Sequence, residues 1–200
     1  MLEAANLTCE RGGKILFQKL SLRVSKEDLL RIAGDNGSGK TSLLRILCGL
    51  AWPAHGEVRW KGEPIRRLGE EYSRSLVHIG HASGLKDELT AAENLAVTCT
   101  LAGIRASDPA IRDALGRFTI APERQVRHLS QGQRRRAALA RLALSGDVPL
   151  WLLDEPFAAL DTVASALVEE LIRAHAGRGG AVVYTTHQAA ALRDTRVIEL

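Results

Sequence analysis

A glycine-rich turn between a buried strand and a helix is the feature that most constrains how this chain can fold. The apolar run DLLRIA at residues 28–33 predicts a buried strand, and a helical pattern runs from about Lys40 to Leu50. The turn between them reads GDNGSGKT and fits the spacing G-x-x-x-x-G-K-[ST]. This succession indicates a sheet with helices on its faces and a phosphate site at a strand end.

The residue types in this turn suit a nucleotide phosphate. Its glycines let the backbone curl, so that several N–H groups point at one phosphate. Lys40 brings positive charge to the β- and γ-phosphates, the Thr41 hydroxyl can bind Mg²⁺, and the helix start adds its dipole. The predicted nucleotide-binding residues are Gly34, Asp35, Asn36, Gly37, Ser38, Gly39, Lys40 and Thr41. A chance glycine-rich turn is the alternative, and the strand–turn–helix context argues against it.

Strand-like and helical patterns alternate along the chain, as expected of a sheet covered by helices. Strands are predicted at residues 2–9, 20–24, 28–33, 57–60, 76–80, 149–153, 181–186 and 196–200, the first two forming an antiparallel piece. Helices are predicted after Thr90, from Asp108, and at residues 162–176. The predicted fold class is α/β. A P-loop NTPase core with a mixed sheet (1–82 and 146–200) carries a small N-terminal β piece and an inserted helical subdomain (83–145) within one domain.

Composition fits a globular domain in a reducing compartment. Of 200 residues, 46% are hydrophobic and 25% charged, which argues against disorder, and the formal charge of +4 does not choose among phosphate, membrane and nucleic acid. Cys9, Cys48 and Cys99 form no C-x-x-C and fit free thiols. Neither a signal peptide nor a membrane-spanning apolar run is found, so any membrane role is expected to need a spanning partner.

A second strand end carries two carboxylates. The run PLWLLDEP places Asp154 and Glu155 directly after an apolar strand, at the edge of a parallel sheet where ligands bind. Asp154 is expected to hold Mg²⁺ through water, and Glu155 to polarise an attacking water. Strands often end in Asp or Glu, so the pair gains weight only beside the glycine-rich turn.

The segment LSQGQRRRAALARLAL distinguishes among the proteins that share this turn. Kinases, GTPases and recombinases do not require Leu129, Ser130, Gly132 and Gln133 at the start of a basic helix. The chain resembles the nucleotide-binding subunit of ABC transporters over essentially all of its length. The markers of that family occur in its order: GDNGSGKT, LSQGQ, Asp154-Glu155, AALD ending at Asp161, and His187 in YTTHQ.

The resemblance implies ATP hydrolysis with Mg²⁺ in a homodimer. ATP on the P-loop of one subunit would be closed over by the signature residues of the other, which here are Ser130, Gln131, Gly132 and Gln133. It also implies that Glu155 is the general base, that His187 contacts the γ-phosphate, and that Asp161 couples the two sites. Closure and reopening of the dimer would then drive a membrane partner.

Two departures from the family pattern, and a run of arginines after the signature, bear on this interpretation. Gln131 stands where the signature usually has Gly, whereas Gly132 is kept, so function is expected to survive. No aromatic lies where one usually stacks on adenine; Arg11 is near that place and is either an adenine contact or a solvated loop charge. The arginines 134–136 are either a nucleic-acid patch or ordinary helix charges, some solvated and some paired, and the second interpretation is favoured.

The stretch HIGHASGLKDELT (78–90) contains the most unusual feature. Family members usually carry Gln at the start of the loop that joins the sheet to the helical subdomain, and here that place is held by His81. A neutral imidazole can still accept from or donate to a water, so we interpret His81 as a substituted catalytic sensor of the γ-phosphate. A metal site with His78 is disfavoured because no third ligand is near, and His78 is interpreted as a partly buried strand residue.

These strings, with CERGGKILF and LWLLDEPFAALD, are similar to the ATP-binding subunit of the haem exporter of bacterial cytochrome c maturation. That implies a peripheral ATPase on the cytoplasmic face of the inner membrane, docked on integral membrane subunits and linked indirectly to a periplasmic haem chaperone. One alternative is the ATPase of another ABC exporter, for lipid, drug or peptide. Another is an ABC ATPase acting on nucleic acid or the ribosome, for which the chain lacks long coiled-coil insertions. A binding-only module would not need Lys40, Glu155 and His187, so an active site is expected. No nucleic-acid partner is expected.

Overall fold

The computed structural model describes residues 1–187, 192 and 195–200, and their strands form two sheets. One is antiparallel, in the order β2-β1-β4-β5, and the other is parallel, in the order β6-β7-β8-β3-β9. The strands are β1 (Leu2–Arg11), β2 (Lys14–Val24), β3 (Leu29–Ala33), β4 (His55–Trp60), β5 (Glu63–Pro64), β6 (Leu76–Ile79), β7 (Leu150–Leu153), β8 (Ala181–Thr185) and β9 (Arg196–Glu199). The predicted mixture of strand directions is therefore a division between two sheets.

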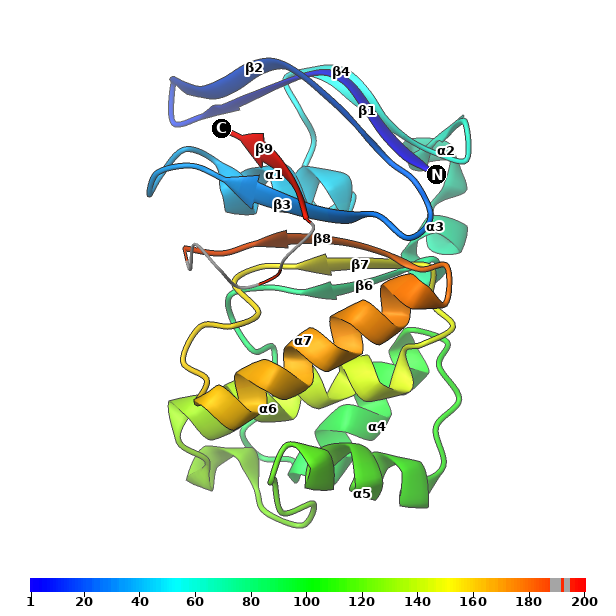
Figure 1. Cartoon of the computed structure of the whole chain (residues 1–200), viewed down its shortest axis with the longest axis vertical. Helices are drawn as coiled ribbons and strands as arrows, with labels where there is room; N and C mark the ends of the chain where they lie inside the picture. The colour runs from blue at the N-terminus through cyan, green and yellow to red at the C-terminus, as the bar shows by residue number, and fades with distance from the viewer. Residues whose placement is uncertain (188–191, 193–194) are drawn as a thin grey trace.

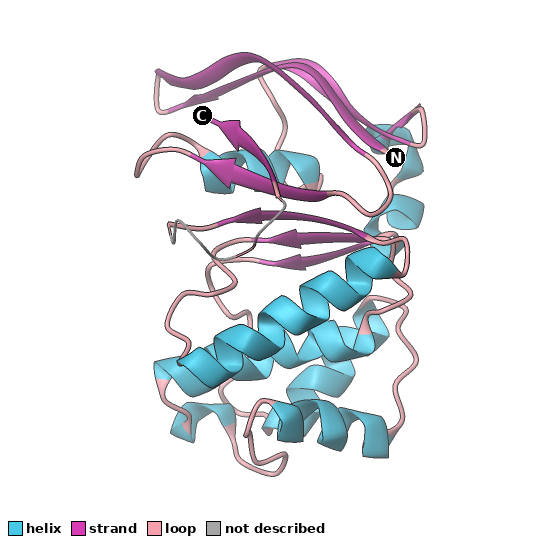
Figure 2. Cartoon of the chain, viewed as in Figure 1, coloured by secondary structure: helices cyan, strands magenta, loops and turns pink. Residues whose placement is uncertain are grey.

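Most of the helices lie at one end of the molecule or against the parallel sheet, whereas the short helix at residues 65–68 lies beside β4 and β5 (Figure 1). They are α1 (Lys40–Leu47), α2 (Ile65–Leu68), α3 (Glu70–Arg74), α4 (Ala91–Leu101), α5 (Asp108–Arg117), α6 (Gln131–Leu139) and α7 (Thr162–Gly177), with the 3-10 turns η1 (Val126–His128) and η2 (Ala140–Leu144). The antiparallel sheet lies at one end and α4, α5 and α6 lie at the other, with the parallel sheet between them (Figure 2).

Several helix boundaries follow from local chemistry that the sequence reveals. Thr90 is the N-cap of α4, as predicted, because its hydroxyl accepts a hydrogen bond from the backbone N–H of Glu93. The helix predicted from Asp108 also begins there, with Ser107 as its N-cap. In contrast, α1 ends at Leu47 rather than near Leu50, because Gly49 takes a left-handed conformation at φ 75° that stops the helix.

The strand predicted at residues 20–24 is longer than its pattern indicates. It begins at Lys14, pairs with β1 from Arg11↔Lys14 to Leu2↔Val24, and contains irregular steps where the register shifts. These bulges interrupt the regular alternation of buried and exposed side chains, which is the signal that a strand leaves in a sequence. The first part of β2, residues 14–19, was missed for this reason.

Alternate residues of the central strands face two separate cores. In β7, Trp151 and Leu153 pack in the cluster that contains residues of α4 to α7, whereas Leu150 and Leu152 pack with α1 and the antiparallel sheet. A strand covered on both faces must be apolar at every position, which explains the uninterrupted LWLL. The sheet is thereby held rigidly between two layers, and the strand ends lie at a fixed edge.

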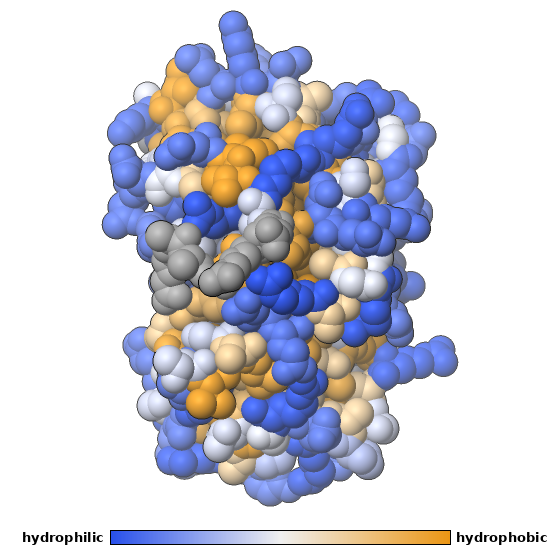
Figure 3. Space-filling view, in the orientation of Figure 1, coloured by the Kyte–Doolittle hydropathy of each residue, from blue (hydrophilic) through white to orange (hydrophobic). Residues whose placement is uncertain are grey.

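The visible face of the molecule is mainly polar (Figure 3). Its apolar surface is gathered in the half that carries β2 and β9. Cys9, Cys48 and Cys99 are buried free thiols, as predicted. In the described part of the chain, no helix combines the length and the apolar character needed to cross a membrane.

Candidate nucleotide-binding site

Four adjacent strands of the parallel sheet end at one edge, and each is followed by a residue that the sequence singled out. The glycine-rich turn follows β3, His81 follows β6, Asp154 and Glu155 follow β7, and His187 follows β8. The register places Ile32 beside Thr185 and Leu153 beside Tyr184, so these ends lie level with one another. Ligands of open parallel sheets bind at this edge.

A cleft of about 560 Å³ opens at this edge and collects most of the predicted site. The predicted residues that line it are Arg11, Asn36, Gly37, Gly39, Lys40, Thr41, His81, Asp154, Glu155 and His187. Arg11 is exposed at the end of β1, with no aromatic side chain lining the cleft among the described residues. Its place on the cleft wall is compatible with an adenine contact, which stays a prediction.

Glycine is required at both ends of the turn for steric reasons. At Gly34, φ is 138° and a Cβ would lie 2.6 Å from the carbonyl oxygen of Leu200. At Gly39, φ is 108° and a Cβ would lie 3.1 Å from Phe17 Cδ1 and from Leu16 Cβ. Any other residue would strain the backbone and push these neighbours apart, so the turn can pass this close to its neighbours only with glycine.

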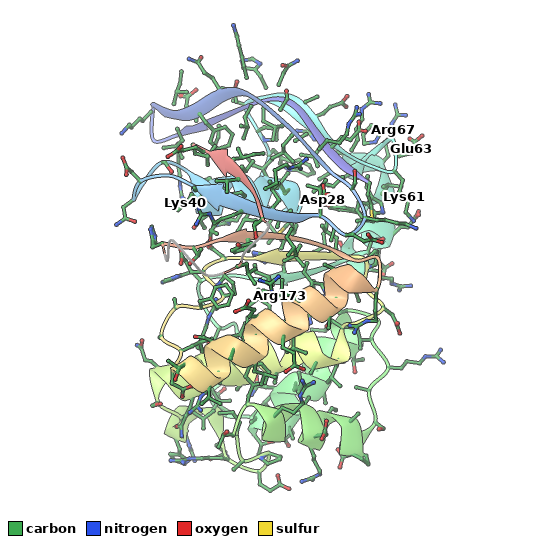
Figure 4. The ribbon with its side chains drawn as sticks, viewed as in Figure 1. Asp28, Lys40, Lys61, Glu63, Arg67 and Arg173 are labelled. Carbon is green, nitrogen blue, oxygen red and sulfur yellow. The ribbon has the colours of Figure 1, made fainter. Side chains whose placement is uncertain are left out.

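Lys40 is held against the turn by its own ammonium group. Its Nζ donates hydrogen bonds to the carbonyl oxygens of Gly34 at 2.7 Å and Asp35 at 2.8 Å. Figure 4 shows the side chain beside the loop between β3 and α1. The lysine is buried but still lines the cleft, so its charge lies at the turn before any phosphate arrives. The side-chain entropy that binding would otherwise cost is therefore partly lost already on folding.

The N-terminus of α1 is open toward the cleft. Its N-cap is Gly39, which has no side chain to cap the helix, and no acidic residue lies in its first turn. The other long helices differ, because α4, α5, α6 and α7 are capped by the side chains of Thr90, Ser107, Ser130 and Asp161. Unpaired N–H groups and the positive end of the helix dipole together favour an anion at α1.

Asp154 lies between two threonine hydroxyls. Thr41 Oγ1 donates to Asp154 Oδ2 at 2.9 Å, and Thr185 Oγ1 donates to Asp154 Oδ1 at 2.7 Å. The Thr185 hydroxyl also accepts from the backbone N–H of Glu155 at 2.9 Å. Thr185 therefore fixes both carboxylate residues. The juxtaposed hydroxyl of Thr41 and carboxylate of Asp154 are hard oxygen donors of the kind that Mg²⁺ binds.

Glu155 has a strained backbone and a histidine partner. Its φ is 50°, a left-handed conformation that is uncommon outside glycine. Its carboxylate accepts from the backbone N–H of His187 at 3.2 Å, and the His187 Nε2 lies 3.2 Å from Oε1. The Glu155 side chain is only 13% exposed whereas that of His187 is 53% exposed, so the imidazole covers the carboxylate from the solvent side.

The two histidines of the HIGH stretch have separate environments. His78 lies in β6 and is half-buried, which confirms the structural interpretation. Burial lowers the pKa of His78, the charges of Arg141 and Arg45 lower it further, and Asp154 opposes them. His81 is exposed and faces the cleft from beyond the strand end, which is the place expected for a sensor of the phosphate.

The signature segment lies apart from the cleft that Lys40 lines. Ser130 caps α6 in a reciprocal box, accepting from the N–H of Gln133 at 3.2 Å while Gln133 Oε1 accepts from the N–H of Ser130 at 2.9 Å. Ser130 and Gln131 instead line a neighbouring groove with His81. Gly132 passes close to Ala159, whose carbonyl oxygen would be 3.3 Å from a Cβ at that position. In one subunit, the signature therefore does not reach the P-loop.

The arginines after the signature are not a common patch. Arg134 pairs with Asp87 at 2.6 Å, and Arg136 Nη1 lies 3.6 Å from an oxygen of Asp161. Arg135 is buried and, within the part of the chain that the structure describes, bonds to three backbone carbonyls. Pairing with nearby acids, the favoured interpretation, is confirmed for two of them. Asp161 also caps α7, accepting from the N–H of Ala164 at 2.7 Å.

Comparison with known proteins identifies the family. The sequence matches the ABC transporter family over residues 17–158, which includes the P-loop, the signature and both carboxylates. The chain belongs to the ABC transporter family. This confirms the predicted fold class and the class of enzyme, an ATP-hydrolysing transporter subunit.

Curated relatives of this ABC subunit match along nearly the whole chain. The cytochrome c biogenesis ATP-binding export protein of Aromatoleum aromaticum is 51% identical over 192 residues, covering 95% of this chain and 90% of that protein. The protein of the same name from Nitrosomonas europaea is 46% identical over 202 residues, covering 100% and 94%. That of Methylococcus capsulatus is 48% identical over 200 residues, covering 98% and 96%.

Solved ABC cassettes share its fold. A dimeric ATP-binding cassette in a post-hydrolysis state, bound to ADP and Pi, superposes with a TM-score of 0.87 at 25% identity, covering 100% of this chain and 94% of that chain. The ATP-binding subunit of another ABC transporter superposes with a TM-score of 0.88 at 22% identity, covering 100% and 85%.

Two residues of this ABC subunit's site were missed by the sequence analysis. Thr185 bonds to both carboxylate residues, and Arg135 bonds to their carbonyls and to that of Gly80. A threonine at the end of β8 had a weak signal, because it lies just before the predicted His187 in YTTHQ. Arg135 had none, since it sits between two arginines that pair with acids and its spacing matches no motif.

Proposed function

We propose that this chain is the ATP-hydrolysing subunit of the haem exporter of bacterial cytochrome c biogenesis. The observation that carries the ATP-hydrolysing part is one cleft that holds the Lys40 ammonium, the Thr41–Asp154 pair and the Glu155–His187 pair. The assignment to cytochrome c biogenesis is supported by relatives of that name at 46–51% identity. Of the family markers predicted from the sequence, residues of the P-loop, Asp154, Glu155 and His187 line that same cleft.

The cation site would be formed by Thr41 and Asp154. Their oxygens lie 2.9 Å apart, and both are hard donors next to the phosphate turn, with Asp154 buried and Thr41 exposed. Thr41 would bind Mg²⁺ through its hydroxyl and Asp154 through a water. Mg²⁺, when bound, supplies positive charge that offsets the negative charge of the ATP phosphates. Thr185 keeps the Asp154 carboxylate in this orientation.

Glu155 would take the proton of the attacking water. Its carboxylate lies on the cleft wall with His187 on its outer side, so a water between Glu155 and the phosphate turn would be oriented by both residues. His81 faces the same space from the end of β6 and would contact the water or the γ-phosphate. Lys40 and the open end of α1 would stabilise charge on the transferred phosphoryl group.

Catalysis would need two subunits. In one chain the signature residues line a groove separate from the P-loop cleft, so a second copy would have to bring Ser130 to the ATP. The dimeric state of the similar cassette bound to ADP and Pi supports a dimer for this chain. Gln131, Gly132 and Gln133 would accompany Ser130 at the start of α6, and Asp161 would couple the two sites.

The complex would lie at the bacterial inner membrane. The chain would bind as a peripheral subunit on the cytoplasmic face of integral membrane subunits, which would span the bilayer. Hydrolysis would be coupled to delivery or release of haem on a periplasmic haem chaperone. Nucleic acid is not proposed as a partner, because two of the three arginines after the signature are engaged by acids.

The hydrolytic part is tested with Glu155→Gln in the purified protein. The amide cannot accept the proton, so the ATPase rate should fall by roughly 10²–10⁴-fold while ATP binding persists and an ATP-bound dimer accumulates. Glu70→Gln is the matched control, because Glu70 is exposed on α3 and pairs only with Arg74. A Glu155→Gln protein that hydrolyses ATP at the wild-type rate would exclude Glu155 as the base.

The haem part is tested in the source bacterium. Cells carrying Glu155→Gln should lose haem-stained c-type cytochromes and accumulate haem on the periplasmic chaperone. Normal cytochromes c in these cells, with the ATPase lost in the purified protein, would overturn the haem assignment and favour another ABC exporter. The two experiments therefore separate the chemistry from the cargo.

A further inference from the structure

Arg135 makes a contact set that the hydrolytic scheme has not used. It lies on the buried side of α6, is 7% exposed, and donates Nη1 to the carbonyl of Gly80 at 2.7 Å. Its Nη2 donates to the carbonyls of Asp154 at 2.7 Å and Glu155 at 2.8 Å. One guanidinium thus joins the signature helix to the ends of both β6 and β7.

The charge of Arg135 has no carboxylate partner of its own. No ion pair within the described residues includes it, whereas its neighbours Arg134 and Arg136 contact Asp87 and Asp161. Burial lowers the pKa of Arg135, and the charges of Asp154 and Glu155 oppose that shift. Burying a cation against neutral carbonyls is costly, so a gain in stability alone is a poor reason for this arrangement.

The three carbonyls belong to the backbone that aims the catalytic side chains. Gly80 directly precedes His81, and Asp154 and Glu155 carry the two carboxylates of the cleft. Glu155 is also the residue with φ 50°, a conformation that persists only where its surroundings hold it. The planar, forked guanidinium fixes the direction of each carbonyl, which a single ammonium cannot do at two strand ends.

We propose that Arg135 is a positioning residue for ATP hydrolysis, which holds the Glu155 backbone and the loop before His81 in register with the signature helix. This rests on the proposed role of Glu155. Because the same helix begins at Ser130, a displacement of α6 moves the Arg135 fork with it. The orientation of the Glu155 side chain in the cleft thereby depends on the position of the signature segment of the same chain.

The test compares Arg135→Met and Arg135→Lys with Arg173→Met, which removes the same charge from an exposed position on α7, where Arg173 pairs with Glu169. Misplacement of a catalytic group by about 1 Å costs on the order of 10²-fold, so kcat of Arg135→Met should fall roughly 10- to 100-fold. The KM and Kd for ATP should stay within about twofold, because the phosphate turn is untouched. Arg135→Lys should recover part of kcat, and Arg173→Met should stay within about twofold of wild type.

The kcat is expressed per functional nucleotide site. The number of sites is titrated with ATP in single-turnover reactions, so that unfolded protein does not lower the value. A wild-type kcat in either Arg135 variant would overturn the inference, and so would a loss of ATP binding in step with kcat. If Arg135→Met fails to fold, Arg135→Lys carries the test with the same criteria. Wild-type protein without ATPase activity would instead overturn the proposed function. If the wild type is active and Glu155→Gln is inactive, the proposed function holds and the Arg135 variants test the positioning role alone.

Discussion

The N-termini of α1 and α6 differ in how their first backbone N–H groups are satisfied. Both helices begin next to a site proposed to receive a phosphate, and both leave N–H groups without helical partners. At α1 the N-cap is Gly39 at φ 108°, which has no side chain to cap the helix start. At α6 the Ser130–Gln133 box satisfies two of these N–H groups within the chain.

The difference indicates how each end can bind. The open end of α1 offers backbone N–H groups directly, so a phosphate there substitutes for a cap and is held by the helix that its own chain provides. At α6 the cap occupies the acceptor side of the Ser130 hydroxyl, and its hydrogen stays available to donate. The end of α6 is therefore stable before any ligand arrives, which suits the proposal that it meets a nucleotide held by another subunit.

The largest effect is expected from Lys40→Ala at the open end. The variant loses a cation that makes charge-assisted hydrogen bonds worth about 1.5–3 kcal/mol each, so ATP affinity should fall about 100-fold or more. Isothermal titration with ATP and Mg²⁺ measures this change. Lys19→Ala, at an exposed position in β2, is the control for loss of charge. An unchanged Kd for Lys40→Ala would mean that the open end of α1 is not the phosphate site.

Ser130→Asp tests the capped end, with the next largest effect. Aspartate caps helices about as well as serine, so the melting temperature should stay within about 2 °C of wild type. Its carboxylate would face the phosphates of the partner's ATP, and kcat/KM should fall more than about tenfold through like-charge repulsion. Ser130→Asn keeps the cap without the charge and should retain more activity. Equal rates for both variants would show that Ser130 faces no phosphate.

The same contrast shows what a sequence can reveal of this site. The open end of α1 was predictable, because its glycines, Lys40 and Thr41 are adjacent in the chain and each has one chemical task. The position of Glu155 followed from a strand end, and His187 was predicted from the resemblance to the family. Arg135 and Thr185 could not be predicted, since their hydrogen bonds run to residues far away in sequence whose distance only the packed sheet determines. The early start of β2 was hidden for a related reason, because its bulges disturb the alternation that reveals a strand.

Gly39→Ala should have a smaller effect at the open end. A Cβ there would lie 3.1 Å from Leu16 and Phe17 atoms, and the φ of 108° strains any L-residue. The melting temperature should fall by about 4–8 °C and ATP affinity several-fold, as expected from about 2 kcal/mol of strain in a protein of this size. Gly37→Ala, at φ 83° with open space around its Cβ, measures strain without the close contact. A larger loss for Gly37→Ala would contradict the role given to close packing at Gly39.

The smallest effect is expected at a capped end with no proposed ligand, that of α4. Thr90→Ala removes the box in which Thr90 accepts from the N–H of Glu93 and the Glu93 carboxylate accepts from the N–H and hydroxyl of Thr90. The melting temperature at pH 7 should fall by about 2–4 °C, with the ATPase rate unchanged.

The pH dependence of that loss separates the two boxes. The Thr90 bonds lower the pKa of Glu93 from its ordinary 4.5, so their contribution is fully present above pH 4.5 and is lost as the pH falls through the lower folded value. The difference between wild type and Thr90→Ala should therefore shrink below pH 4.5. The box of α6 uses the neutral amide of Gln133, so the loss in Ser130→Ala should not change over that range. Melting curves of wild type and of both variants from pH 7 to pH 3.5 measure these losses. If the loss in Thr90→Ala does not shrink below pH 4.5, the charge of the Glu93 carboxylate adds nothing to the cap.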